Sequence, residues 1–181
     1  MQELLAHYLF HWTSEKAIWL GGHTLSWDAR CAGIYAGFGC ALLLQFFWYQ
    51  RRITLPPWPI LAMAAGFSLP MFIDVGTVAY GLRLASNPIK YLTGAWFGIS
   101  FCCILFPAVA QFNRQRKPRL QLNFVRFSLI LAIGSAVSYL THWNHPIAFY
   151  LLEALAWLGF SGLVLLLLAG LLYSLWPPQP S

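Results

Sequence analysis

The sequence predicts an all-α fold, a polytopic membrane helical bundle of about five transmembrane helices with an N-terminal interfacial helix. Hydrophobic residues make up 59% of the 181 residues and charged residues only 9%, whereas about a quarter are charged in an ordinary soluble domain. The mean hydropathy is +0.62, and several apolar runs approach the roughly 20 residues that a helix needs to cross a bilayer. This composition excludes a typical water-soluble enzyme, and we expect residues 1–181 to form a single membrane domain.

The first 30 residues are expected to form an external segment at the membrane surface. Within residues 1–20, apolar side chains recur at helical spacing, which is typical of an interfacial helix. These side chains are Leu4, Leu5, Tyr8, Leu9 and Trp12. The segment is too polar to span a membrane. It also lacks the basic start of a signal peptide, so we expect no cleaved leader.

Five hydrophobic segments are expected to cross the membrane. They lie at about 31–49, 58–76, 88–112, 121–141 and 147–176. Prolines separate them, because proline interrupts a helix but is well tolerated in its first turn. Pro57 precedes the second segment, Pro88 opens the third, and Pro118 separates the third from the fourth. Residues 143–146 form a tight loop before the fifth.

The basic residues predict the orientation, because Lys and Arg near span ends are retained on the cytoplasmic side. Seven basic residues and no acidic residue cluster at one side: Arg51, Arg52, Arg114, Arg116, Lys117, Arg119 and Arg126. We therefore expect a multi-pass protein of the cell (inner) membrane, with its N-terminus outside and its C-terminus cytoplasmic. The net charge of +6 is then mainly a topology signal, and no nucleic-acid partner is expected.

Small residues recur inside two of the predicted spans. Gly33 and Gly37 form a GxxxG motif in the first span, and Gly94 and Gly98 form another in the third. This spacing allows two helix backbones to approach closely. We expect the first and third spans to pack closely, either within the chain or against a second copy of it.

Two carboxylates lie at membrane depth, where an ionisable side chain costs at least about 2.5–3.5 kcal/mol and requires a partner or a watery cavity. Asp74 stands near the outer end of the second span, and Glu153 lies about two turns into the fifth. Asp74 is either an interfacial cap or ion pair, or a functional group. Glu153 either pairs with Arg83 or Lys90, or has a functional role.

The segment 80–94 is the more specific candidate for binding. Asn87 followed by Pro88 predicts the start of a helix, with Asn87 as its N-cap. A helix N-terminus favours anions, yet Lys90 sits in the first turn. The segment predicts a donor-rich pocket for a phosphate or carboxylate, or for the chain's own Asp74 and Glu153. The alternative is a helix start whose lysine reaches lipid headgroups. The candidate ligand-binding residues are Arg30, Asp74, Arg83, Ser86, Asn87, Lys90, Thr93 and Glu153.

Four residues near the N-terminus are candidate metal ligands. They are His11, His23, Asp28 and Cys31, which are types that bind zinc or another transition metal. Their spacing matches no compact metal-binding motif, and isolated His and Asp residues in an external segment are usually solvated. A metal ion is therefore a candidate cofactor, with simple solvation as the alternative.

Two segments resemble the motifs of a bacterial integral membrane family of unknown function, catalogued as domain of unknown function 2085. The first runs Arg-Cys-Ala-Gly-Ile-Tyr-Ala-Gly-Phe over 30–38. The second runs Gly-Leu-Arg-Leu-Ala-Ser-Asn-Pro-Ile-Lys-Tyr-Leu-Thr-Gly over 81–94. Asp74 stands between them, as in the family pattern. The resemblance covers about residues 10–98 and implies a membrane protein with no established reaction.

The chain departs from the family pattern at three places. The family's Cys-His pair is Phe10-His11 here, the first Cys of its Cys-x-Arg-Cys is Asp28, and the Arg of its second motif is Lys90. If the family's cysteines and histidine bind a metal, this chain keeps only His11 and Cys31, with Asp28 as a harder ligand. Zinc binding would then be weaker or absent.

Three functions agree with these patterns. The first is a binding or transport-related membrane protein whose outer polar pocket holds an anionic lipid headgroup or a small anion. The second is a membrane enzyme acting on a lipid phosphate, with Asp74 as base or metal ligand and Lys90 and Arg83 holding the phosphate. The third is a structural or assembly subunit of a larger membrane complex. Membrane lipids are the expected partners, together with other subunits or a second copy of the chain.

Overall fold

The computed structural model describes residues 18–49, 53–84, 86–112 and 120–175. Five helices in this part of the chain are long and apolar enough to cross a membrane. They are α2 (Ala29–Tyr49), α3 (Trp58–Ala79), α4 (Asn87–Phe112), α5 (Phe124–Tyr139) and α6 (Pro146–Leu175). The fourth reaches this length only together with the 3-10 helix that extends it to His142. A helix covers each of the five predicted spans, with ends within about three residues of the predicted ones.

Short elements connect the helices. The strand β1 (Trp19–Leu20) pairs antiparallel with β2 (His23–Thr24), and β3 (Ile53–Thr54) pairs in parallel with β4 (Leu120–Gln121). The 3-10 helix η2 (Leu140–His142) follows α5 directly.

The prediction of an interfacial helix over residues 1–20 is wrong for its last two residues, because Trp19 and Leu20 form the strand β1 of a hairpin. Gly21 and Gly22 have φ angles of +56° and +83°. Two left-handed residues in succession reverse the chain into a tight hairpin turn. The N–H of Gly21 donates to Oδ1 of Asn144 at 2.7 Å, which ties the hairpin to the α5–α6 connection. The predicted helix over residues 1–17 lies outside the described residues.

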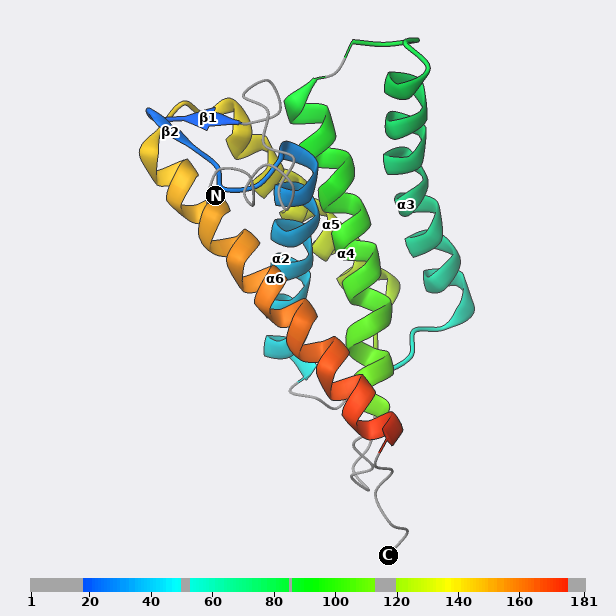
Figure 1. Cartoon of the computed structure of the whole chain (residues 1–181). Coiled ribbons are helices and arrows are strands. Elements are labelled where there is room, and N and C mark those ends of the chain that lie inside the picture. The colour runs from blue at the N-terminus through cyan, green and yellow to red at the C-terminus, as the bar shows by residue number, and fades with distance from the viewer. Residues whose placement is uncertain (1–17, 50–52, 85, 113–119, 176–181) are drawn as a thin grey trace, which may run out of the picture.

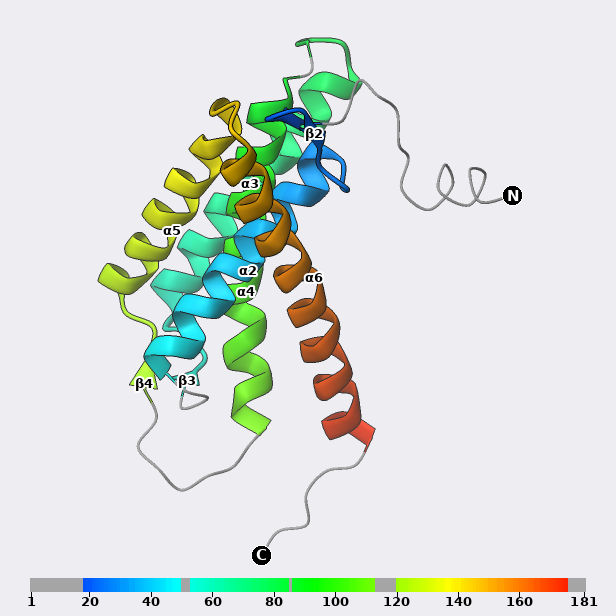
Figure 2. The same ribbon diagram turned by 90° about the vertical axis from the view of Figure 1, so that its left-hand side faces the viewer.

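Helix α2 lies at the centre of the bundle. It contacts α4, α6 and α5, while α3 packs against α4. Figure 1 shows α4 between α2 and α3, and Figure 2 shows α2 and α4 between α5 and α6. The β1–β2 hairpin, the α3–α4 connection and the α5–α6 connection lie at one end of the bundle, which we call the hairpin end (Figure 1).

Glycines allow the backbones of α2 and α4 to touch. A Cβ atom added to Gly33 or Gly37 would lie 2.1 or 2.3 Å from a backbone oxygen of α4. A Cβ atom on Gly98 would lie 2.0 Å from the carbonyl oxygen of Ile34, and one on Gly94 would lie 2.5 Å from a backbone oxygen of α2. The predicted close packing of the first and third spans is therefore confirmed, and it occurs within one chain.

Helix α6 approaches α2 by the same means. A Cβ atom on Gly159 would lie 1.8 Å from the carbonyl oxygen of Tyr35, and one on Gly39 would lie 2.5 Å from the carbonyl oxygen of Leu155. The sequence did not single out this contact, because neither glycine belongs to a GxxxG motif.

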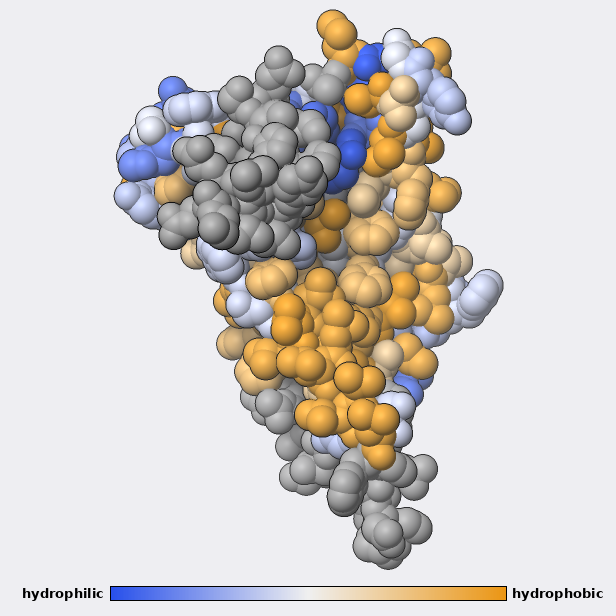
Figure 3. Space-filling view, in the orientation of Figure 1, coloured by the Kyte–Doolittle hydropathy of each residue, from blue (hydrophilic) through white to orange (hydrophobic). Residues whose placement is uncertain are grey.

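The outer surface of the bundle is apolar, as contact with lipid requires. Only 11% of the most apolar 18-residue stretch of α6 is buried inside the bundle. Figure 3 shows hydrophobic residues over much of the visible surface between the two ends. The exposed large hydrophobic residues on the C-terminal half of α6 are Val164, Leu165, Leu167, Leu168, Leu171, Leu172 and Leu175.

We predict that Gly98→Ala destabilises the bundle, because its methyl group would collide with the backbone of α2. Overpacking of this kind costs about 1–3 kcal/mol of unfolding free energy. Gly66 on α3 provides a matched control, since a Cβ atom there would meet nothing within 4 Å. Gly66→Ala should be neutral or stabilising by up to about 1 kcal/mol. Unfolding in detergent micelles measures both, and equal effects of the two variants would contradict the assigned contact.

Candidate functional site

Asp74 is the centre of a charged cluster at the hairpin end. Its side chain is only 3% exposed, and its Oδ2 accepts a hydrogen bond from Nη2 of Arg30 at 2.6 Å. Its Oδ1 forms a second ion pair with Nη2 of Arg83. A buried carboxylate requires such partners, since its desolvation is otherwise uncompensated. The structure therefore brings together three of the predicted site residues from α2, α3 and the α3–α4 connection.

Local backbone geometry positions the two arginines. Arg30 lies in the first turn of α2, where the missing side chain of Gly94 lets α4 approach. Gly81 has a φ angle of +69°. The N–H groups of Gly81 and Leu82 donate to the carbonyls of Val78 and Thr77 at 3.1 and 2.9 Å, the pair of bonds that closes a Schellman motif. This turn folds the chain after α3 back on itself, which places Arg83 beside Asp74.

Lys90 adds a third cation in the first turn of α4. The residue is 8% exposed, and no acceptor within the described part of the chain forms a hydrogen bond or ion pair with its ammonium group. Its backbone N–H donates to the carbonyl of Ser86 at 3.0 Å. The helix therefore begins at Asn87, with Ser86 rather than Asn87 accepting the first helical bond. Thr93 is buried, and its hydroxyl donates to the carbonyl of Ile89 at 2.9 Å.

Glu153 does not join this cluster. Its Oε2 accepts from the backbone N–H of Ser26 at 3.2 Å, and its Oε1 accepts from Nε1 of Trp157 at 2.9 Å. Neither Arg83 nor Lys90 pairs with it among the described residues. The prediction of such a pair is wrong, because α6 packs beside α2 and the hairpin, whereas Asp74 lies on α3.

The candidate metal ligands have other contacts in the structure. Asp28 caps α2, since its Oδ2 accepts from the N–H of Arg30 at 3.3 Å and its carbonyl from the N–H of Ala32 at 2.8 Å. His23 stacks on Phe149 with ring centroids 5.0 Å apart. Among the described residues, no three His, Cys, Asp or Glu side chains are grouped to hold a metal ion.

The remaining metal candidates keep that hypothesis open. Cys31 is a half-buried free thiol that packs against the apolar cluster beneath the hairpin. His11 lies outside the described residues, so a site that includes it stays a prediction.

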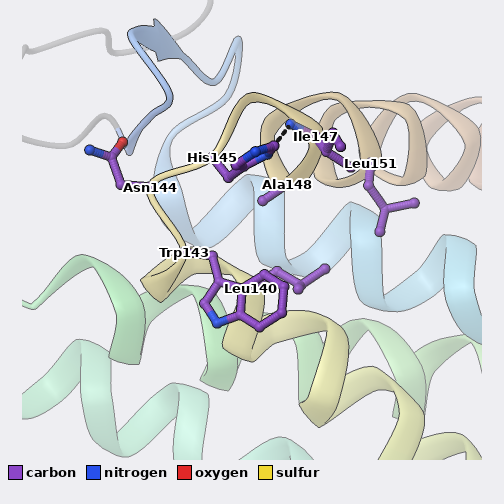
Figure 4. A pocket seen from close by; sticks show the side chains of 7 residues that line it. All are labelled: Leu140, Trp143, Asn144, His145, Ile147, Ala148 and Leu151. Atoms are coloured by element: carbon purple, nitrogen blue, oxygen red, sulfur yellow. Dashed lines mark hydrogen bonds between the residues drawn. The ribbon is translucent and has the colours of Figure 1, made fainter.

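A hollow of about 440 Å³ lies at the α5–α6 connection. Figure 4 shows the side chains that line it: Leu140, Trp143, Asn144, His145, Ile147, Ala148 and Leu151. Nδ1 of His145 accepts from the N–H of Ile147 at 3.2 Å. The lining is otherwise largely apolar, so the hollow offers few groups for recognising a polar ligand.

Residues 10–104 match the sequence model of a family described as predicted membrane protein (DUF2085). The chain belongs to this family. The DUF2085 match includes α2, α3 and most of α4, so it contains the cluster of Arg30, Asp74, Arg83 and Lys90. Helices α5 and α6 lie beyond it. No curated protein and no solved structure matches the chain.

We predict that Asp74→Asn lowers the unfolding free energy of this DUF2085 protein. Removing one partner of a fully buried ion pair costs about 3–5 kcal/mol. We expect about 1–3 kcal/mol here, because the side chains of Arg30 and Arg83 are 21% and 34% exposed and can reach solvent. Chemical unfolding in detergent micelles measures the change.

Asp28→Asn is the matched control for this substitution. It also removes one carboxylate, but asparagine caps a helix about as well as aspartate, so the stability should stay almost unchanged. An equal loss in the two variants would show that the ion pairs of Asp74 do not stabilise the fold.

Proposed function

We propose that this membrane protein binds an anionic group at the hairpin end, either the headgroup of an anionic lipid or a small anion of the same chemistry. The observation that carries the proposal is Lys90, a residue that is only 8% exposed as a whole and forms no ion pair with a described carboxylate. Lysine is rarely so buried unless it is paired. A bound phosphate or carboxylate would supply the missing partner.

The charges around Lys90 support an anion. Asp74 is already shared by Arg30 and Arg83, so among the described ion pairs it offers no partner to Lys90. The first turn of α4 contributes a partial positive charge, which favours anions and disfavours a cation. Both effects disfavour an unpaired lysine and favour a bound anion.

We propose further that the hairpin end faces the outside of the cell (inner) membrane. The support is the excess of Lys and Arg predicted at the opposite end. Six of these seven residues lie outside the described residues. The seventh, Arg126, lies in the first turn of α5, with its guanidinium 4.9 Å from the ring centre of Tyr49. The N-terminus would then lie outside and the C-terminus inside.

The other two functions have different support. An assembly subunit would use the ion pairs of Asp74 to tie α2 to α3 and would offer the exposed leucines of α6 to another subunit or a second copy. A lipid-phosphate enzyme has less support, because both oxygens of the carboxylate that would serve as its base already accept from arginine.

We expect Lys90→Ala to weaken the binding of an anionic lipid at least about tenfold, since hydrogen bonds to charged groups contribute about 1.5–3 kcal/mol. The probe is phosphatidate, which is anionic, in nanodiscs with an excess of phosphatidylcholine. Native mass spectrometry counts the phosphatidate retained by each variant. Competition with inorganic phosphate distinguishes a site for a free anion from a site that also needs the lipid chains.

Two control variants accompany this experiment. Lys90→Arg keeps the charge and should retain phosphatidate, and Arg126→Ala removes a cation from the opposite end and should also retain it. Equal retention by Lys90→Ala and the wild type would overturn the proposed site.

The orientation is tested by labelling introduced cysteines with a membrane-impermeant thiol reagent. Leu84→Cys lies at the hairpin end, where the native residue is 92% exposed, and Phe124→Cys lies at the other end, where it is 60% exposed. In intact cells we expect labelling of the first variant only, above the wild-type background. Phe124→Cys should label after permeabilisation, and the reverse pattern would contradict the proposed orientation.

A further inference from the structure

A second hollow lies at the hairpin end, between the start of α4 and the end of α5 with η2. Its volume is about 330 Å³, which is at the small end of the range for ligand sites in proteins. It is distinct from the charged cluster, since Arg30, Asp74, Arg83 and Lys90 do not line it. Hydroxyl groups dominate its polar lining. They belong to Ser86, Ser135, Ser138, Tyr139 and Thr141.

These hydroxyls retain both donor and acceptor capacity. Ser138 donates to the carbonyl of Gly134, and Thr141 donates to the carbonyl of Ser138, each at 2.8 Å. Their oxygen lone pairs therefore stay available as acceptors. Ser135 accepts from Nε1 of Trp96 at 2.9 Å, so its own proton is free to be donated. Ser138 is 5% exposed, so its hydroxyl lies at the edge of the buried core.

The rest of the lining favours a neutral ligand. None of the described residues that line the hollow is Asp, Glu, Lys or Arg. Pro88, Ile89 and Leu92 supply an apolar wall from α4, and His142 adds an imidazole whose ring lies 5.2 Å from that of Tyr139. Mixed hydroxyl donors and acceptors beside an apolar wall suit a molecule with several hydroxyls and a carbon face.

We propose that this hollow binds a polyol, namely the sugar or glycerol headgroup of a neutral membrane lipid or the corresponding free polyol. Its position at the end of the membrane-spanning helices favours the lipid as the source, because lipid headgroups lie at that level. The site differs from the proposed anion site in its chemistry, since it offers hydroxyls without a fixed charge; Ser86, which lines it, also precedes the helix turn that holds Lys90.

The test uses the full-length protein in nanodiscs that contain monoglucosyl diacylglycerol and an excess of phosphatidylcholine. Native mass spectrometry measures how much glucolipid each variant retains. The test variants are the double substitution of Ser86→Ala with Thr141→Val, and Ile89→Trp, which fills the hollow from a position that is 42% exposed. The matched control is Ser68→Ala with Thr77→Val, which removes two hydroxyls from α3 that bond only to their own helix.

We expect the wild type and the α3 control to retain glucolipid in preference to phosphatidylcholine. The Ser86 and Thr141 double variant should retain about tenfold less glucolipid, since each hydrogen bond raises the affinity about two- to tenfold. Ile89→Trp should retain almost none. Lys90→Ala should retain as much as the wild type, so failure here is distinguishable from failure of the anion site.

Competition with free glucose shows whether the site recognises a free polyol or needs the whole lipid. Complete displacement shows that the headgroup chemistry suffices, and incomplete displacement shows that the lipid chains contribute; both support the site. No preference for glucolipid over phosphatidylcholine would overturn the proposal. An equal loss in the α3 control would overturn it as well.

Discussion

The rest of the fold depends on the close approach of α2 to α4 and α6 through glycine. Lipid tails are as apolar as leucine, so helices in a membrane gain little from hiding apolar side chains and associate through close packing instead. Gly33 and Gly98 place the backbones of α2 and α4 in contact, and Gly159 does the same for α6. This contact sets the first turn of α4 beside the first turn of α2. The same contact holds Arg30, whose carbonyl oxygen lies against Gly94, at the end of the bundle where the charged cluster forms.

The buried carboxylate of Asp74 then determines how the hairpin end closes. Two guanidinium groups neutralise it, one from α2 and one from the connection that follows α3. The peripheral helix α3, which packs mainly on α4, thereby gains a second attachment to the centre of the bundle. Among the described residues, Lys90 takes no part in these ion pairs, so the network around Asp74 is complete without it.

Much of the fold could be predicted from the sequence, because long apolar runs and prolines define membrane spans almost without reference to tertiary structure. Asp74 and Arg83 could be associated because a short connection separates them. The neighbours of Glu153 could not be predicted, since hydropathy does not reveal which helix packs on which. The hairpin over 19–24 had a local signal in Gly21 and Gly22, but the apolar spacing upstream favoured a helix. The cap formed by Asp28 likewise had a signal, an aspartate just before a helix.

The unequal lengths of the helices couple the bundle to the thickness of its bilayer. The 16 residues of α5 with the three of η2 reach about 30 Å, close to the hydrocarbon thickness of a typical membrane. The 30 residues of α6 reach about 45 Å, and Figure 1 shows this helix running obliquely across the bundle. A helix longer than the hydrocarbon layer tilts or thickens it locally. The length of α5 with η2 therefore matches the hydrocarbon layer, whereas α6 is longer than this layer is thick. A change in membrane thickness consequently alters the tilt of α6 first.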